Sequence, residues 1–219
     1  MYIEAEISTI IILILSVGLS LIMSINLIRK RTGNLFYWSA GLWVFSISVA
    51  IEVVFAFGIF SDLLMGLYLF LVAILVEFLA IGSVTLLGKK RLSDAYIIFN
   101  IAADIFLIVS LGTTNVGDII TQGVVFGTLP ILVTIASSIA TFPAAILLVL
   151  ISAISYRKTR NNKLLSIIAG VIVVSIAGTL YIVAFPAFLY YAELAGIALL
   201  WLGFVDFKAI SKSNVISHH

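Results

Sequence analysis

Long apolar runs separated by short polar stretches make up most of the chain. A run of about twenty apolar residues is long enough to cross the hydrocarbon core of a bilayer as a helix. The connections between the runs are short, so the pattern predicts a single transmembrane domain over residues 1–219. The predicted membrane-spanning helices lie near residues 7–28, 35–58, 63–87, 95–111, 124–155, 164–185 and 187–207.

Helices are predicted because a spanning backbone must pair its own polar groups in lipid, and the runs lack the alternation of barrel strands. The fold class is therefore all-α integral membrane, a seven-transmembrane helical bundle. The fifth run is too long for one straight crossing and contains Pro130 and Pro143, so we expect a kink, a strong tilt or an interfacial lead-in there. The fourth run is the shortest, and Asn100 and Asp104 interrupt it.

The basic residues all fall on one side of the membrane if the seven runs are spans. Basic residues near span ends are retained in the cytoplasm, so the asymmetry predicts an external N-terminus and a cytoplasmic C-terminus. We expect a multi-pass protein of the plasma membrane. The basic residues are Arg29, Lys30, Arg31, Lys89, Lys90, Arg91, Arg157, Lys158, Arg160, Lys163, Lys208 and Lys212.

Composition agrees with a membrane protein and removes several kinds of chemistry. The chain is 63% hydrophobic and 10% charged, with a net charge of +2. We expect its basic residues to contact lipid headgroups, and no nucleic-acid partner is implied. Cysteine is absent, and the two histidines, His218 and His219, resemble the remnant of a purification tag. We therefore expect no cofactor and no haem, zinc or iron–sulfur site, and any metal within the spans would be held by oxygen atoms.

The first run follows Glu4 and Glu6 without a basic leader, so we expect it to be retained as a span.

A shift of the chain by 128 residues suggests an internal repeat. It places Arg29, Lys30, Asn34, Ala56 and Phe57 on Arg157, Lys158, Asn162, Ala184 and Phe185. Spans one to three would then match spans five to seven in a 3+1+3 parallel repeat, with span four as the linker. Small residues in two spans, Ala136, Ala140 and Ala144 in the fifth and Gly170 and Gly178 in the sixth, are expected to let helices pack closely.

The seven-helix plan with an external N-terminus is similar to that of microbial rhodopsins, which bind retinal through a lysine in the middle of the seventh span. In this chain Lys208 lies beyond the apolar part of that span, which predicts a rhodopsin-like bundle without a retinal lysine. SWEET-type sugar transporters share the 3+1+3 plan, but Pro130, Pro143 and Pro186 do not supply their set of prolines. Trimeric cation channels share the orientation but carry glycine pairs that this chain lacks. No family is assigned.

Four carboxyl groups interrupt the apolar runs: those of Glu52, Glu77, Asp104 and Glu193. A charged carboxylate at the bilayer centre costs roughly 3 kcal/mol or more, so such a group faces the bundle interior, stays protonated or binds a cation. No Lys, Arg or His lies within the predicted spans to pair with them. Two polar residues, Ser48 and Asn100, stand four positions before Glu52 and Asp104, on the same helical face. We expect these six residues to form a string of polar groups running from the outer side to the centre.

The leading functional hypothesis is a small transporter or channel for protons or small cations, with those six residues along its path. The alternative is a non-catalytic subunit or sensor in a larger membrane complex, in which the acids form interhelical hydrogen bonds. An intramembrane enzyme or lipid-binding protein is less favoured, because no nucleophile and base are readable, and no catalytic residue is predicted. Both a homo-oligomer and a membrane-complex partner are compatible with the sequence.

Overall fold

The computed structural model describes residues 2–114, 116, 120–121, 124–125, 129–160, 165–167, 169–170, 173 and 186–204. This part of the chain is helical apart from a small antiparallel ribbon, which pairs Ile120 with Val125 and Thr121 with Val124. The elements are α1 (Tyr2–Lys30), α2 (Gly33–Ala56), α3 (Asp62–Thr85), α4 (Lys90–Thr113), β1 (Ile120–Thr121), β2 (Val124–Val125), α5 (Ile131–Thr159) and α7 (Pro186–Phe204).

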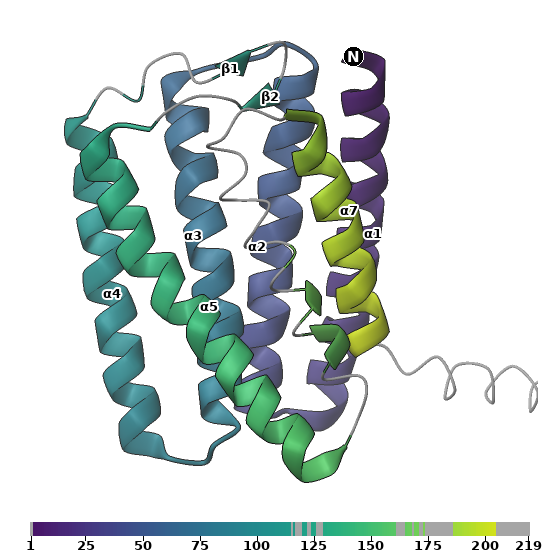
Figure 1. Ribbon diagram of the computed structural model, residues 1–219, viewed down its shortest axis with the longest axis vertical. Helices are drawn as coiled ribbons and strands as arrows, with labels where there is room; N and C mark the ends of the chain where they lie inside the picture. The colour runs from purple at the N-terminus through teal and green to yellow at the C-terminus, as the bar shows by residue number, and fades with distance from the viewer. Residues whose placement is uncertain are drawn as a thin grey trace, which may run out of the picture.

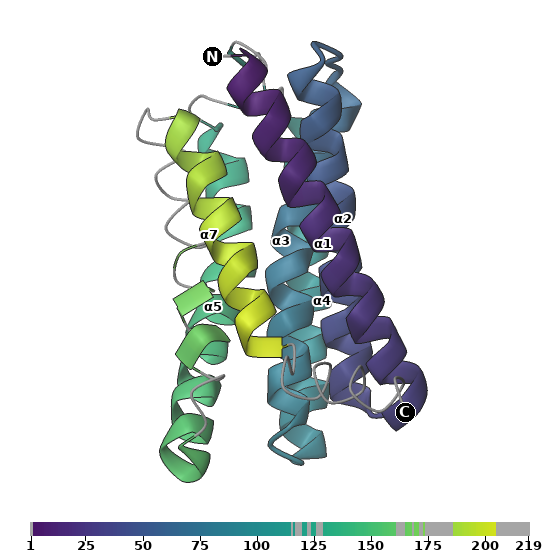
Figure 2. The same cartoon turned by 90° about the vertical axis from the view of Figure 1, so that its right-hand side faces the viewer.

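Five of these helices, α1 to α5, are long and apolar enough to cross a membrane, as in a multi-pass membrane protein. Successive helices from α1 to α4 run in opposite directions, and α5 crosses them obliquely (Figure 1). Helix α3 occupies the middle of the arrangement and packs against α2, α4 and α5. Helix α7 lies beside α1, which Figure 2 shows from the side.

Helices α1 to α4 overlap the first four predicted spans, and α7 overlaps the seventh, but the fifth span begins later than predicted. Val124 and Val125 belong to the ribbon rather than to a helix, and α5 begins at Ile131 after Pro130 in an extended conformation. The prediction of a helix from residue 124 was therefore wrong at its start, because the proline lacks the backbone N–H that continuing the helix would use. Pro143 lies inside α5. This helix lies obliquely in the bundle, which agrees with the expected tilt (Figure 1). Helix α4 is longer than its predicted span, 95–111.

The predicted sixth span, 164–185, lies almost wholly outside the described residues, so the count of seven spans and the repeat stay predictions. One observation agrees with pairing spans one and five. Helices α1 and α5 each have 29 residues and carry basic residues in their last turn. Each is followed by a left-handed arginine, Arg31 or Arg160, with φ of 48° or 52°. In each case the backbone N–H closes the helix by donating to a carbonyl four residues earlier, at 2.7 Å.

The described basic residues gather at one end of the bundle. Helices α1, α3 and α5 finish at this end, and α2 and α4 begin there (Figure 1). The positive-inside interpretation requires such an arrangement, and the orientation across the membrane stays a prediction. Lys163, Lys208 and Lys212 lie outside the described residues, as do His218 and His219.

Serine hydroxyls and one indole join α1 to α2. Ser20 Oγ lies 3.1 Å from Ser46 Oγ, and Ser24 Oγ lies 3.0 Å from Ser39 Oγ. The Trp43 indole N–H also donates to Ser24 Oγ at 3.0 Å. Hydrogen bonds of this kind hold helices together in lipid, where apolar burial alone supplies little attraction between helices.

Two further tryptophans connect helices that are distant in the sequence. The Trp201 indole N–H donates to the carbonyl of Leu15 at 2.9 Å, which joins α7 to α1. The Trp38 indole N–H donates to the carbonyl of Leu79 at 3.2 Å, which joins α2 to α3. The ring of Trp38 lies so close to Gly82 that a Cβ atom there would stand 2.4 Å from its Cδ1 atom. Only glycine leaves room for this ring.

Small residues allow α5 to approach α3 and α4. Ala136, Ala140 and Ala144 are all fully buried, which confirms their predicted role in packing. Gly170 also packs closely, since a Cβ atom at this position would stand 3.2 Å from the carbonyl oxygen of Gly196 in α7. Gly178 lies outside the described residues.

Candidate functional site: two buried carboxyl pairs

The structure describes all four predicted intramembrane acids and places them inside the bundle. Glu52, Glu77 and Glu193 are 3%, 2% and 7% exposed, and Asp104 is half-buried. They do not form the single string that we expected. Instead they form two carboxyl pairs, Glu52 with Glu193 and Glu77 with Asp104, each made across an interface between helices.

The first pair joins α2 to α7, near the end of the bundle opposite to the basic residues. The carboxyl groups of Glu52 and Glu193 lie within interaction distance of each other. The Tyr68 hydroxyl of α3 donates to Glu52 Oε1 at 2.5 Å, so three helices meet at this pair. The ring of Tyr68 is held edge-on against Phe55, with 5.8 Å between ring centroids.

Sequence reasoning did not find Tyr68, because a tyrosine in an apolar helix carries no spacing signal toward an acid on another helix. Ser48, which was expected to accompany Glu52, is buried, but its hydroxyl donates to the Phe45 carbonyl of its own helix at 2.8 Å. Ser48 therefore has a local partner, and Tyr68 supplies the hydroxyl group at Glu52.

The second pair joins α3 to α4. The carboxyl groups of Glu77 and Asp104 lie within interaction distance of each other. Tyr96 and Asn100 stand at intervals of four residues before Asp104, so the three side chains share one face of α4. The Tyr96 hydroxyl lies beside the Asn100 amide and interacts electrostatically with Glu77. The sequence predicted Asn100 from this spacing and missed Tyr96, which is one turn further along the same face.

The two pairs lie on opposite sides of α3. Tyr68, which contacts the first pair, and Glu77, which belongs to the second, are nine residues apart in this helix. Nine residues correspond to about two and a half helical turns, or roughly 13 Å along the axis. The half turn directs one side chain toward α2 and the other toward α4, so the backbone of α3 separates the two pairs.

Neither pair has a basic partner among the described residues of the spans. The described Lys and Arg side chains lie at the helix ends. Buried carboxylates without a counter-charge are costly in lipid. Each pair is therefore neutral only when its acids carry protons or when a cation accompanies them.

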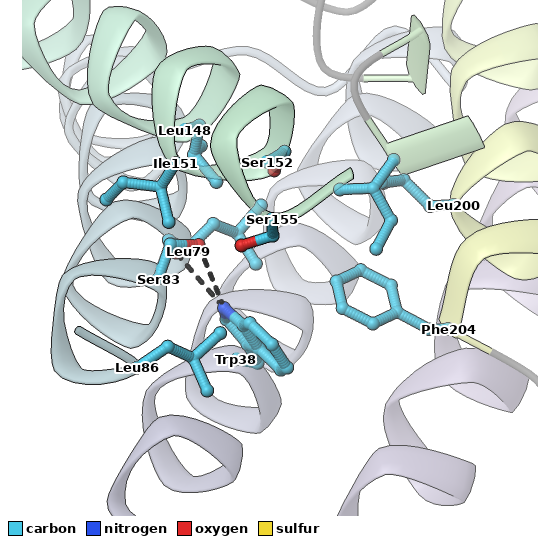
Figure 3. A pocket seen from close by; sticks show the side chains of 11 residues that line it. Trp38, Leu79, Ser83, Leu86, Leu148, Ile151, Ser152, Ser155, Leu200 and Phe204 are labelled. Carbon is cyan, nitrogen blue, oxygen red and sulfur yellow. Dashed lines mark hydrogen bonds between the residues drawn. The ribbon is translucent and has the colours of Figure 1, made fainter. Parts of the chain in front are cut away.

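A small cavity lies near the basic end, away from both pairs. It has a volume of about 30 Å³, which is room for only one or two water molecules. The hydroxyls of Ser83, Ser152 and Ser155 border it, together with the indole of Trp38 and apolar side chains of α3, α5 and α7 (Figure 3). In Figure 3 the Trp38 indole points to the Leu79 carbonyl and to Ser83 Oγ. No acid lines this cavity.

Comparisons of the chain with protein-family models, with curated proteins and with solved structures find no match. The two carboxyl pairs and the helices that position them are the features of this chain that point to a function.

Proposed function

We propose that the protein is a small multi-pass transporter or channel of the plasma membrane that moves protons or small cations through its intramembrane carboxyl groups. The observation that carries this proposal is the pairing of four buried or half-buried acids without a basic partner in the described spans. Ionisable groups at this depth are uncommon and by default indicate function. The orientation proposed is N-terminus out and C-terminus in, with the bundle of seven spans as one domain.

The Glu77–Asp104 pair is the better candidate for the transport step. Asp104 is half-buried on α4, so this pair reaches the side of the bundle, whereas Glu52 and Glu193 are both enclosed. Two adjacent carboxyl groups can share one proton and release it when water reaches them, because like charges close together cannot both ionise easily. The proposed path therefore uses Glu77 and Asp104 to bind and pass on a proton, with Asn100 as a polar neighbour.

The test is proton flux in vesicles that contain the purified chain and a pH-sensitive dye. We expect the wild type to move protons faster than protein-free vesicles, and Glu77→Gln and Asp104→Asn to abolish that excess. Both substitutions keep the shape of the side chain and remove its acidic proton. Asp62→Asn is the matched control, because Asp62 is an exposed acid at the start of the same helix as Glu77.

Absence of flux from wild-type vesicles across a range of pH and cations would reject the transporter proposal. If the wild type shows no flux and Glu77→Gln and Asp104→Asn lower stability in detergent, the acids serve as interhelical hydrogen bonds. That outcome would favour the alternative function, a non-catalytic subunit or sensor of a larger membrane complex.

A further inference from the structure

The Glu77–Asp104 pair is surrounded by oxygen atoms that proton transfer alone does not require. Glu77 Oε1, Asp104 Oδ1, the Tyr96 hydroxyl and the Asn100 side-chain oxygen are all buried, and none has a hydrogen-bond partner among the described residues. Asn100 is only 2% exposed, and its amide nitrogen is also unpartnered. A buried amide without partners is costly, because each unsatisfied group loses about 1–3 kcal/mol. A ligand bound by several of these oxygen atoms would offset that cost.

We infer that Glu77, Asp104, Asn100 and Tyr96 form a binding site for a sodium ion, which enters in exchange for one proton. The inference rests on the proposed function and names its second substrate. Hard cations bind to carboxylate, amide and hydroxyl oxygens, and two helices bring all three types together here. When Na⁺ enters, one carboxyl group releases its proton to water and the other keeps its proton. The charge of the site is therefore the same before and after the exchange.

The charge of the cluster favours a monovalent ion. With one carboxylate and one carboxylic acid the cluster carries a single negative charge, which one Na⁺ neutralises. A divalent ion would require both protons to leave, and its removal from water costs about four times as much, because the Born energy rises with the square of the charge. Few protein oxygens are available to offset that cost.

The other titratable groups on the packed helices do not compete for the ion. On α4 the titratable neighbour is Tyr96, which belongs to the cluster. Helix α5 also packs against α3 and α4, but its titratable side chains, Tyr156, Arg157 and Lys158, all lie in its last turn. On α2, Glu52 is on the opposite side of α3 and bonded to Tyr68.

A hydrophobic carbodiimide tests the inference without any transport measurement, because dicyclohexylcarbodiimide modifies protonated carboxyl groups in apolar surroundings. The full chain in detergent is labelled at fixed pH in NaCl or in choline chloride, and mass spectrometry locates the adduct. We expect NaCl to slow labelling of the carboxyl group that gives up its proton, Glu77 or Asp104, by about tenfold or more. The NaCl concentration needed should fall about tenfold for each unit rise in pH, since one ion displaces one proton.

Asn100→Leu tests the ligand set, since it removes the amide oxygen and keeps the volume. We expect this variant to be labelled normally in choline chloride and to need about tenfold more NaCl for protection. A tenfold weaker affinity corresponds to a loss of about 1.4 kcal/mol of binding free energy, which we assign to the one missing ligand. Ser110→Ala is the matched control, because Ser110 is a buried α4 residue whose hydroxyl already donates to the Phe106 carbonyl. This control should be protected like the wild type.

Equal labelling in the two salts, or protection of Asn100→Leu at wild-type NaCl, would overturn the inference. If neither carboxyl group reacts, thermal unfolding in the two salts tests for sodium binding instead. A bound sodium ion raises the unfolding temperature in NaCl above that in choline chloride, and equal unfolding temperatures would overturn the inference. Proton flux without Na⁺ protection would reject the sodium site and leave the proposed function standing. Protection without proton flux would leave the site and reject proton transport.

Discussion

The Tyr68→Phe substitution tests whether the first carboxyl pair holds helices together. It removes the hydroxyl that donates to Glu52 Oε1 and keeps the ring that packs against Phe55. Glu52 is 3% exposed, so water cannot readily replace the lost donor. Its second oxygen, Oε2, already lacks a hydrogen-bond partner among the described residues. Among the described residues, the substitution therefore leaves Glu52 with Glu193 as its polar neighbour.

Two magnitudes compete in this prediction. A buried acceptor that loses its donor costs about 1–3 kcal/mol. Interhelical hydrogen bonds in membrane proteins average only about 0.6 kcal/mol, because an unfolded chain in the membrane finds other partners. The enclosed position of Glu52 favours the larger value, so we expect Tyr68→Phe to lower the free energy of unfolding by about 1–2 kcal/mol.

Reversible unfolding in mixed micelles, followed by circular dichroism, measures this change. Tyr37→Phe is the matched control, since Tyr37 is a half-buried tyrosine near the basic end of α2. We expect the control to stay within about 0.5 kcal/mol of the wild type. A Tyr68→Phe variant as stable as that control would refute the role assigned to this hydrogen bond.

Two further predictions concern packing and orientation. Gly82→Ala should destabilise the protein by about 1–3 kcal/mol, because its Cβ atom would collide with Trp38, whereas Gly66→Ala on the same helix meets nothing within 4 Å and should not. Thermal unfolding of the two variants separates these outcomes, and equal stability would contradict the close packing of Trp38. A reporter fused after His219 should be cytoplasmic and one fused before Met1 external, and both on the same side would reject the odd number of spans.

The lengths of the apolar runs were sufficient to predict most of the described helices. Helices α1 to α3 lie within a few residues of their predicted ends, with α1 beginning at Tyr2, because the cost of burying polar backbone in lipid applies to every run alike. The start of α5 was missed because the apolar run continues through Val124 and Val125 into a ribbon. Apolar composition alone does not distinguish a ribbon from a helix, and Pro130 was a local signal of the boundary.

The candidate site could be predicted in part. Spacing within one helix placed Asn100 beside Asp104, since residues four apart share a face. The partner of each acid depends instead on how different helices pack, and no spacing within a helix contains that information. This is why Glu193 and Tyr68 were not assigned to Glu52, and why four acids expected in one string form two pairs.

Because α3 separates the two pairs, they are suited to different roles. A proton at Glu52 cannot pass directly to Glu77, since the backbone of α3 stands between the two pairs and Tyr68, the partner of Glu52, lies roughly 13 Å from Glu77 along the axis of α3. The enclosed pair, bonded to Tyr68, is suited to fixing α2, α3 and α7, whereas the pair that reaches the side of α4 is suited to exchange. A Tyr68→Phe variant that loses stability but keeps flux, beside a Glu77→Gln variant with the opposite behaviour, would assign these two roles. Loss of flux in both variants would show instead that transport depends on both sides of α3.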